Sequence, residues 1–267
     1  MKGSFNKLLI LFLIAAMVGV FSVCALGEGV RVLLYHHLVE GEPASEMELS
    51  REDFAAQMDY LYQHGYQVLS LEEFIEFYNQ GEFPADSVLI TFDDGYYSFY
   101  SHAYPVLLKY DFPAVIFPVI EYMPGLEREQ LYTDYLSFHH LRLMDRDSGL
   151  VETGSHTYNL HYLTEEGLPA VKQKEDEGDE EYRERIMRDL RVSRDLLELQ
   201  LDQKIISLAW PFGEDTELAR ELAEKLGYQL LFSGHPGVVT PETDLGDIPR
   251  YSVFRGDLDY FNRLMQR

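Results

Sequence analysis

Apolar and polar positions along the chain alternate in blocks that predict short buried strands separated by amphipathic helices. Compact apolar and β-branched runs predict strands at 32–35, 68–70, 87–92, 114–118, 150–153, 205–210, 230–233 and 251–254. Apolar residues at helical spacing predict helices over 50–64, 70–78, 182–201 and 214–226. Ser50 stands at an N-cap position with Gly65 just past the end of that helix, and Ser70 and Glu73 have capping-box spacing.

This alternation of strands and helices indicates an α/β fold with a parallel sheet. A count of about seven to eight parallel strands, without an internal repeat or a low-complexity linker, predicts a single-domain distorted (β/α) barrel, closed or nearly closed. In such barrels the chemistry lies at the carboxyl ends of the strands. We therefore expect the functional residues directly after the predicted strands.

The first 25 residues have the pattern of a signal peptide. Lys2 and Lys7 precede or border an uncharged stretch, 8–23, whose sixteen residues fall short of the roughly 20 that span a bilayer. Val23 to Ala25 then provide small residues at signal-peptidase spacing. We expect a mature domain, 26–267, that is exported and has no integral membrane span; an uncleaved anchor is the alternative. The single cysteine, Cys24, excludes an intramolecular disulfide.

The chain is strongly acidic, with 46 acidic and 22 basic side chains and a formal charge of −24. This charge excludes a nucleic-acid binder that acts through general electrostatics, because phosphates would be repelled. Hydrophobic residues make up 46% of the chain, enough for a large core. The acidic run 174–185 is a solvated helix start or, alternatively, a surface that attracts a polycation.

Two carboxylates follow the predicted strand 87–92. Asp93 and Asp94 belong to the pentapeptide Thr-Phe-Asp-Asp-Gly at 91–95. Because successive strand side chains point to opposite sides, one aspartate can hold a metal ion while the other faces a bound water. Gly95 permits a tight turn directly after them. Taken alone, the pentapeptide also fits a surface turn with solvated carboxylates.

Two histidines follow the predicted strand 150–153. His156 and His161 stand five residues apart, and on a helix this spacing turns side chains about 140° away from each other. The pair therefore converges on one ion only from a loop. Two imidazoles and one carboxylate of the aspartate pair form a facial ligand set that leaves positions for water and substrate. Zinc, cobalt, nickel and iron all suit such a set.

These motifs resemble those of the polysaccharide deacetylase, or NodB-homology, family. The similarity covers 91–95 and 155–161 and extends to 35–37, 95–118, 181–186, 210–213 and 248–250, and so to nearly the whole mature chain. The five-residue histidine spacing, in place of the commoner four, is similar to that of the poly-β-1,6-N-acetylglucosamine deacetylases of biofilm systems.

The resemblance implies a NodB-type barrel and one divalent metal ion. Carried over by position, Asp93 is the general base, and Asp94, His156 and His161 are the metal ligands. The family hydrolyses N-acetyl groups of sugar polymers, which releases acetate and leaves a free amine. An N-acetylated polysaccharide is therefore the expected partner, and we expect the protein to be a monomer.

The chain departs from the family pattern where many members carry an arginine, two residues before the proline of the third motif. Ala209 stands there in this sequence. Arg250, on a later predicted strand, is a candidate partner that would keep Asp93 ionised, with a structural ion pair as the equal alternative.

The Leu-x-His motif that supplies a proton donor in many relatives is also not found. His36 and His235 each follow a predicted strand and are candidate donors, although a lone histidine is more often structural. Trp210 and Phe212 are candidates for an apolar wall against the sugar, or for packing at the barrel mouth.

The sequence thus predicts an exported, metal-dependent polysaccharide N-deacetylase, with poly-β-1,6-N-acetylglucosamine as the first-choice substrate. A peptidoglycan or chitin-type N-acetylglucosamine deacetylase with the same machinery is the alternative within the enzyme class. A non-catalytic polysaccharide-binding protein on the same fold is the alternative outside it.

Overall fold

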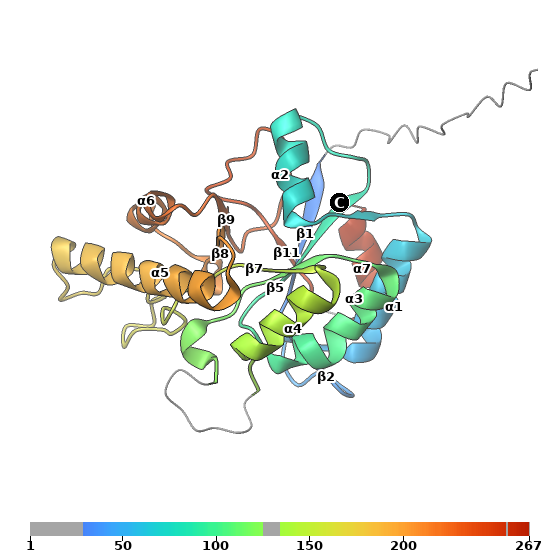
Figure 1. Cartoon of the computed structure of the whole chain (residues 1–267), viewed down its shortest axis with the longest axis horizontal. Coiled ribbons are helices and arrows are strands. Elements are labelled where there is room, and N and C mark those ends of the chain that lie inside the picture. Colours follow the sequence, from blue (N-terminus) through green and yellow to red (C-terminus); the bar gives the residue numbers. More distant parts are fainter. Residues whose placement is uncertain (1–28, 125–133, 255, 267) are drawn as a thin grey trace, which may run out of the picture.

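A computed structural model describes residues 29–124, 134–254 and 256–266 (Figure 1). The α-helices are α1 (Arg51–Gln63), α2 (Leu71–Gln80), α3 (Tyr104–Tyr110), α4 (Phe138–Ser148), α5 (Asp179–Leu201), α6 (Glu217–Leu226) and α7 (Leu258–Met265). The strands are β1 (Val30–Tyr35), β2 (His37–Val39), β3 (Glu48–Ser50), β4 (Gln67–Val68), β5 (Ser87–Phe92), β6 (Ala114–Ile116), β7 (Val151–Thr153), β8 (Ser207–Ala209), β9 (Leu230–Phe232), β10 (Val238–Val239) and β11 (Tyr251–Ser252). The predicted signal peptide lies outside the described residues.

The strands form a distorted barrel that isolated bridges complete. The main sheet has the order β10-β1-β5-β6-β7, in which β4 also pairs with β5 and β11 with β1, and β8 and β9 form a separate ladder. Ser155 bridges to Leu208, and Phe232 bridges to Ile248. The segment 248–252 therefore contacts β9 through Ile248 and then β1 through β11, which closes the circle. The strand pairs of the barrel are parallel except β1 with β10.

The helices cover the outside of this barrel. Figure 1 shows α1, α3 and α7 on one side and α5 beside α6 on another, and these neighbours are in contact. Within the described residues, no helix combines the length and the apolar composition needed to cross a bilayer.

The predicted strands and helices are all present in the predicted order, with shifted ends. The structure adds the short strands β2, β3 and β10 and the helices α3, α4 and α7, which the predicted ranges do not include. Ser50 caps α1, and Ser70 with Glu73 forms the expected capping box of α2. Helix α5 begins at Asp179 rather than Tyr182, because three acidic residues in its first turn favour the positive helix end. Helix α6 begins at Glu217 rather than Glu214, since the Thr216 side chain accepts a hydrogen bond from Ala219 N and caps the helix there.

Strand alternation places part of β5 inside the barrel. Leu89 packs in an interior cluster with Val32, Val115 and Phe232, whereas Val88, Ile90 and Phe92 pack in the larger cluster beneath the helices. Thr91 and Asp93 have the same parity as Leu89, so they continue the interior face towards the barrel mouth. The fold thereby directs the Asp93 carboxylate into the mouth.

Candidate active site

A tight turn after β5 separates the two aspartates. Asp94 has a positive φ of 68° and Gly95 one of 77°, conformations that aspartate tolerates and glycine adopts freely. A Cβ atom at Gly95 would lie 2.7 Å from Pro118 Cβ, so this turn also requires glycine for space. The turn directs Asp93 and Asp94 to different partners.

Asp94, His156 and His161 bring their donor atoms together. The Nε2 atoms of His156 and His161 lie 3.4 and 3.1 Å from Asp94 Oδ1, and ligand atoms of all three residues lie within 4.8 Å of one another. His156 and Asp94 are buried, and His161 is about one-fifth exposed. The two histidines approach from an irregular loop after β7, in which Thr157 has a φ of 71°. The expectation that only a loop lets them converge is confirmed.

The donor set fits a divalent metal ion. His156 Nδ1 lies 2.8 Å from Ala209 O, so it carries the proton and leaves the Nε2 lone pair towards Asp94. Asp94 Oδ1 is buried and has no hydrogen bond with acceptable geometry within the described residues. Ligands on a tetrahedral ion at 2.0–2.1 Å stand about 3.3 Å apart, close to the separations observed here. Burial raises the pKa of Asp94, but the two imidazoles outweigh this effect and lower it.

Asp93 forms a buried, two-pronged ion pair with Arg250. Arg250 Nη1 donates to Asp93 Oδ1 at 2.7 Å, and Nη2 donates to Oδ2 at 2.8 Å. Arg250 Nε donates to Ser233 O, and the guanidinium lies about 6 Å from the rings of Phe117 and Phe232. Burial raises the pKa of Asp93, but the charges of Arg250 and His156 together lower it by more than burial raises it. The net pKa of Asp93 is therefore below its ordinary value. Asp93 is thus an ionised carboxylate, with Oδ2 3.9 Å from His156 Nε2.

Aromatic side chains border the exposed side of the metal-ligand cluster formed by Asp94, His156 and His161. The Phe212 ring stacks on His161 at a centroid distance of 4.7 Å and is 47% exposed, so it can meet a ligand. On another side, Tyr122 Oη donates to His161 O at 2.8 Å, and Tyr135 packs between Tyr122 and Tyr96. None of these tyrosines was predicted from the sequence, although Tyr96 directly follows the Thr-Phe-Asp-Asp-Gly motif at 91–95.

The remaining predicted site residues separate into three environments. His36 is close enough to Asp93 and Asp94 for their charges to act on it, although burial dominates and lowers its pKa. Trp210 is fully buried and belongs to the main core, so it packs the barrel and does not form an exposed wall. His235 is half exposed, and its Nε2 lies 3.0 Å from Asp247 Oδ1, which places its side-chain contact outside the cluster.

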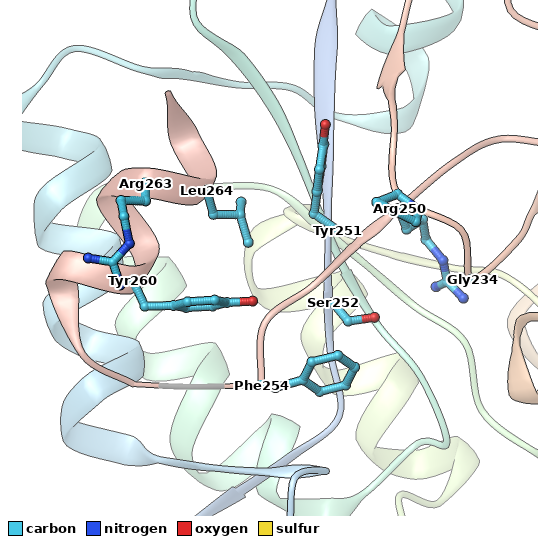
Figure 2. A pocket seen from close by; sticks show the side chains of 9 residues that line it. Gly234, Arg250, Tyr251, Ser252, Phe254, Tyr260, Arg263 and Leu264 are labelled. Atoms are coloured by element: carbon cyan, nitrogen blue, oxygen red, sulfur yellow. The ribbon is translucent and has the colours of Figure 1, made fainter. Parts of the chain in front are cut away.

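A cavity of about 290 Å³ lies between β11 and α7. Arg250, the partner of Asp93, is one of the residues that line it. Figure 2 shows the Tyr260 ring extending from α7 towards Ser252, with Phe254 nearby, whereas the Arg250 side chain points away from α7. The two faces of this segment are therefore different: Arg250 reaches inward to Asp93, and its neighbours line the cavity.

Comparison with protein families gives a match to the polysaccharide deacetylase model over residues 80–231, more than half of the chain. The chain is 32% identical to the poly-β-1,6-N-acetyl-D-glucosamine N-deacetylase of Escherichia coli strain K12, with 83% of this chain and 36% of that protein covered. It thus spans about a third of the length of that relative. The enzyme of the same name from Staphylococcus aureus strain MSSA476 is 30% identical, with 82% and 71% covered.

Among solved structures, IcaB from Ammonifex degensii is similar to this chain with a TM-score of 0.77 and 29% identity. The match covers 90% of this chain and 97% of IcaB. This agreement supports the distorted barrel as the arrangement of nearly the whole described chain.

Proposed function

Because the chain belongs to the polysaccharide deacetylase family, we propose that it hydrolyses N-acetyl groups of poly-β-1,6-N-acetylglucosamine and releases acetate. The names of the E. coli and S. aureus relatives support this choice of polymer. The five-residue spacing of His156 and His161 supports it independently. The signal-peptide pattern at the N-terminus supports export, which would bring the enzyme to such a polymer.

One observation carries the proposal: a buried, arginine-paired carboxylate lies beside three convergent metal-ligand side chains. Asp93 Oδ2 is 3.9 Å from the same His156 Nε2 that faces Asp94. A protein that only bound polysaccharide would have little physical need for an ionised base in that position.

Asp94, His156 and His161 would hold the divalent ion. When bound, the metal supplies Lewis-acid chemistry: it polarises the acetamide carbonyl and lowers the pKa of a water molecule. The three side chains leave the side towards Phe212 and Tyr122 for substrate, because these residues border His161.

Asp93 acts as the general base and removes a proton from the attacking water. Arg250 keeps Asp93 ionised and fixes the plane of its carboxylate through both oxygens. The nitrogen must be protonated as the carbon–nitrogen bond breaks, because an amide anion does not leave. Asp93 returns to this nitrogen the proton that it took from water, and His36, which lies within electrostatic reach of Asp93, is a second candidate donor.

The test is acetate release from linkage-defined oligosaccharides by the purified protein, first stripped of metal and then reloaded with zinc, cobalt, nickel or iron. Metal-dependent release from β-1,6-linked N-acetylglucosamine oligomers supports the proposal. Release only from β-1,4-linked oligomers points to the peptidoglycan or chitin type. A folded, metal-loaded protein that releases no acetate from either substrate would contradict the proposal and favour the polysaccharide-binding alternative.

A further inference from the structure

The loop that carries both candidate histidine ligands has an acceptor for each backbone N–H from 155 to 160. These donors and acceptors are Ser155 N to Ser207 O, His156 N to Pro118 O, Thr157 N to Ser155 Oγ, Tyr158 N to Asp189 Oδ1, Asn159 N to Asp189 Oδ2, and Leu160 N to Thr157 Oγ1. The loop conformation is therefore specified at every residue between the two histidines.

Asp189 supplies two of these acceptors from outside the loop. It lies in α5, and its two carboxylate oxygens accept from consecutive backbone N–H groups, Tyr158 N at 2.9 Å and Asn159 N at 2.8 Å. Tyr158 and Asn159 occupy the middle of the stretch that separates His156 from His161. Helix α5 thus supports the loop midway between its two imidazoles.

Ser193, one turn after Asp189 on the same helix, supports the start of the loop. Its Oγ lies 2.6 Å from Ser155 Oγ, which in turn accepts from Thr157 N. Thr157 is β-branched and has a φ of 71°, a conformation that such a residue keeps only where its surroundings hold it. The α5 contacts flank this strained residue on both sides.

We propose that Asp189, assisted by Ser193, is a positioning residue that sets the metal affinity of the site by fixing the direction of both imidazoles. The inference rests on the proposed function, since it assumes that His156 and His161 hold a metal ion. Groups that orient metal ligands typically change metal affinity by about 10- to 100-fold when removed. A purely structural role predicts lower stability of the metal-free protein but unchanged metal affinity.

The experiment measures zinc and cobalt affinity of the purified protein by competition with a chromophoric chelator. The variants are Asp189→Ala, Asp189→Asn and Ser193→Ala, and Asp195→Asn is the matched control because it changes an exposed carboxylate on the same helix. Circular dichroism identifies a temperature at which each metal-free variant is folded. If Asp189→Ala does not fold at any temperature, Asp189→Asn and Ser193→Ala provide the result.

We expect a loss of zinc affinity of about 10- to 100-fold for Asp189→Ala. Asp189→Asn should lose less, because its amide oxygen still accepts one of the two N–H bonds, and Asp195→Asn should match the wild type. Wild-type affinity in the folded Asp189 and Ser193 variants would overturn this inference alone. A wild-type protein that binds no divalent metal would overturn both the inference and the proposed function.

Discussion

Arg250 lies 157 residues after Asp93 in the chain, yet its two terminal nitrogens contact the two oxygens of that carboxylate. The arginine expected two residues before the third-motif proline is absent, and the Ala209 carbonyl at that position instead accepts the His156 Nδ1 proton. Arg250 reaches Asp93 from the segment that closes the barrel. In this chain the cation beside Asp93 therefore comes from the segment 248–252 and not from the third motif.

Replacing Asp93 by asparagine tests the general base. We expect acetate release to fall by about 10²- to 10⁴-fold, because an amide does not accept the water proton. Zinc affinity should stay close to that of the wild type, since the metal ligands are other residues. Activity and chelator competition are measured on the folded variant, beside Asp195→Asn. An Asp93→Asn variant with wild-type turnover would assign the base elsewhere.

Replacing Arg250 by glutamine leaves Asp93 buried without its cation. We expect the free energy of unfolding to drop by about 3–5 kcal/mol, the range for breaking one partner of a buried pair. Arg250→Lys should lose less, because it keeps the charge but not the two-pronged geometry. Urea unfolding of the metal-free protein measures this effect. Arg263→Gln, a change to an exposed arginine of the neighbouring cavity, is the control and should be nearly neutral.

Replacing Phe212 by alanine removes the ring that stacks on His161. Because this ring is 47% exposed, we expect little change in stability. An aromatic contact with the sugar predicts a loss in kcat/KM of roughly 2- to 10-fold. Phe254→Ala, which removes a similarly exposed ring from the neighbouring cavity, is the matched control. Equal kcat/KM values for Phe212→Ala and the wild type would exclude Phe212 from substrate binding.

Asp189 makes stability depend on pH in a defined direction. Burial raises its pKa to about 6, while the N–H groups of Tyr158 and Asn159 lower it in part. The folded state therefore holds the proton more tightly than the unfolded state, and this stabilisation is lost as pH rises from about 4 to 6. A two-unit shift corresponds to about 3 kcal/mol.

The measurement is the difference in unfolding free energy between the metal-free wild type and Asp189→Asn from pH 4 to 8. We expect the wild type to lose up to about 3 kcal/mol relative to the variant between pH 4 and 6, and nothing further above that range. A difference that is constant with pH would contradict the raised pKa.

The formal charge of −24 predicts attraction to the cationic product polymer. Deacetylation converts neutral units to glucosamine, which carries positive charge. Binding of partly deacetylated polymer to the catalytically weakened Asp93→Asn variant should therefore weaken as salt rises from about 10 to 500 mM, as the Debye length shortens. Fully acetylated polymer, which is neutral, is the control. Salt-independent binding of both polymers would exclude this electrostatic contribution.

The sequence predicted the features that local pattern determines. Strand β5 matched its predicted bounds, and the aspartates and histidines appeared after strands, where parallel-sheet geometry gathers them. The capping residues Ser50 and Ser70 were also identified correctly, because caps depend on neighbouring residues alone.

The features that could not be predicted from the sequence depend on contacts between distant segments. Arg250 was equally compatible with a structural ion pair, and only barrel closure shows that it meets Asp93. Asp189 carries no local signal, since it is one acidic residue among many on α5. The sequence left two environments open for Trp210, an apolar wall against the sugar and packing in the core, because residues at strand ends occur in both. Trp210 is fully buried, which assigns it to the core.

The long sequence separation between Asp93 and Arg250 has a consequence for what makes the active site complete. Asp94, His156 and His161 lie within the first two-thirds of the chain, whereas the segment 248–252 joins β9 to β1 near the C-terminus. Contacts between distant segments form slowly because loop closure has an entropic cost. The Asp93–Arg250 pair therefore closes a longer loop than the contacts of Asp94 with His156 and His161. A chain that ended before 248–252 would keep all three metal-ligand residues but lack the cation beside its base, so metal occupancy alone does not report a complete active site.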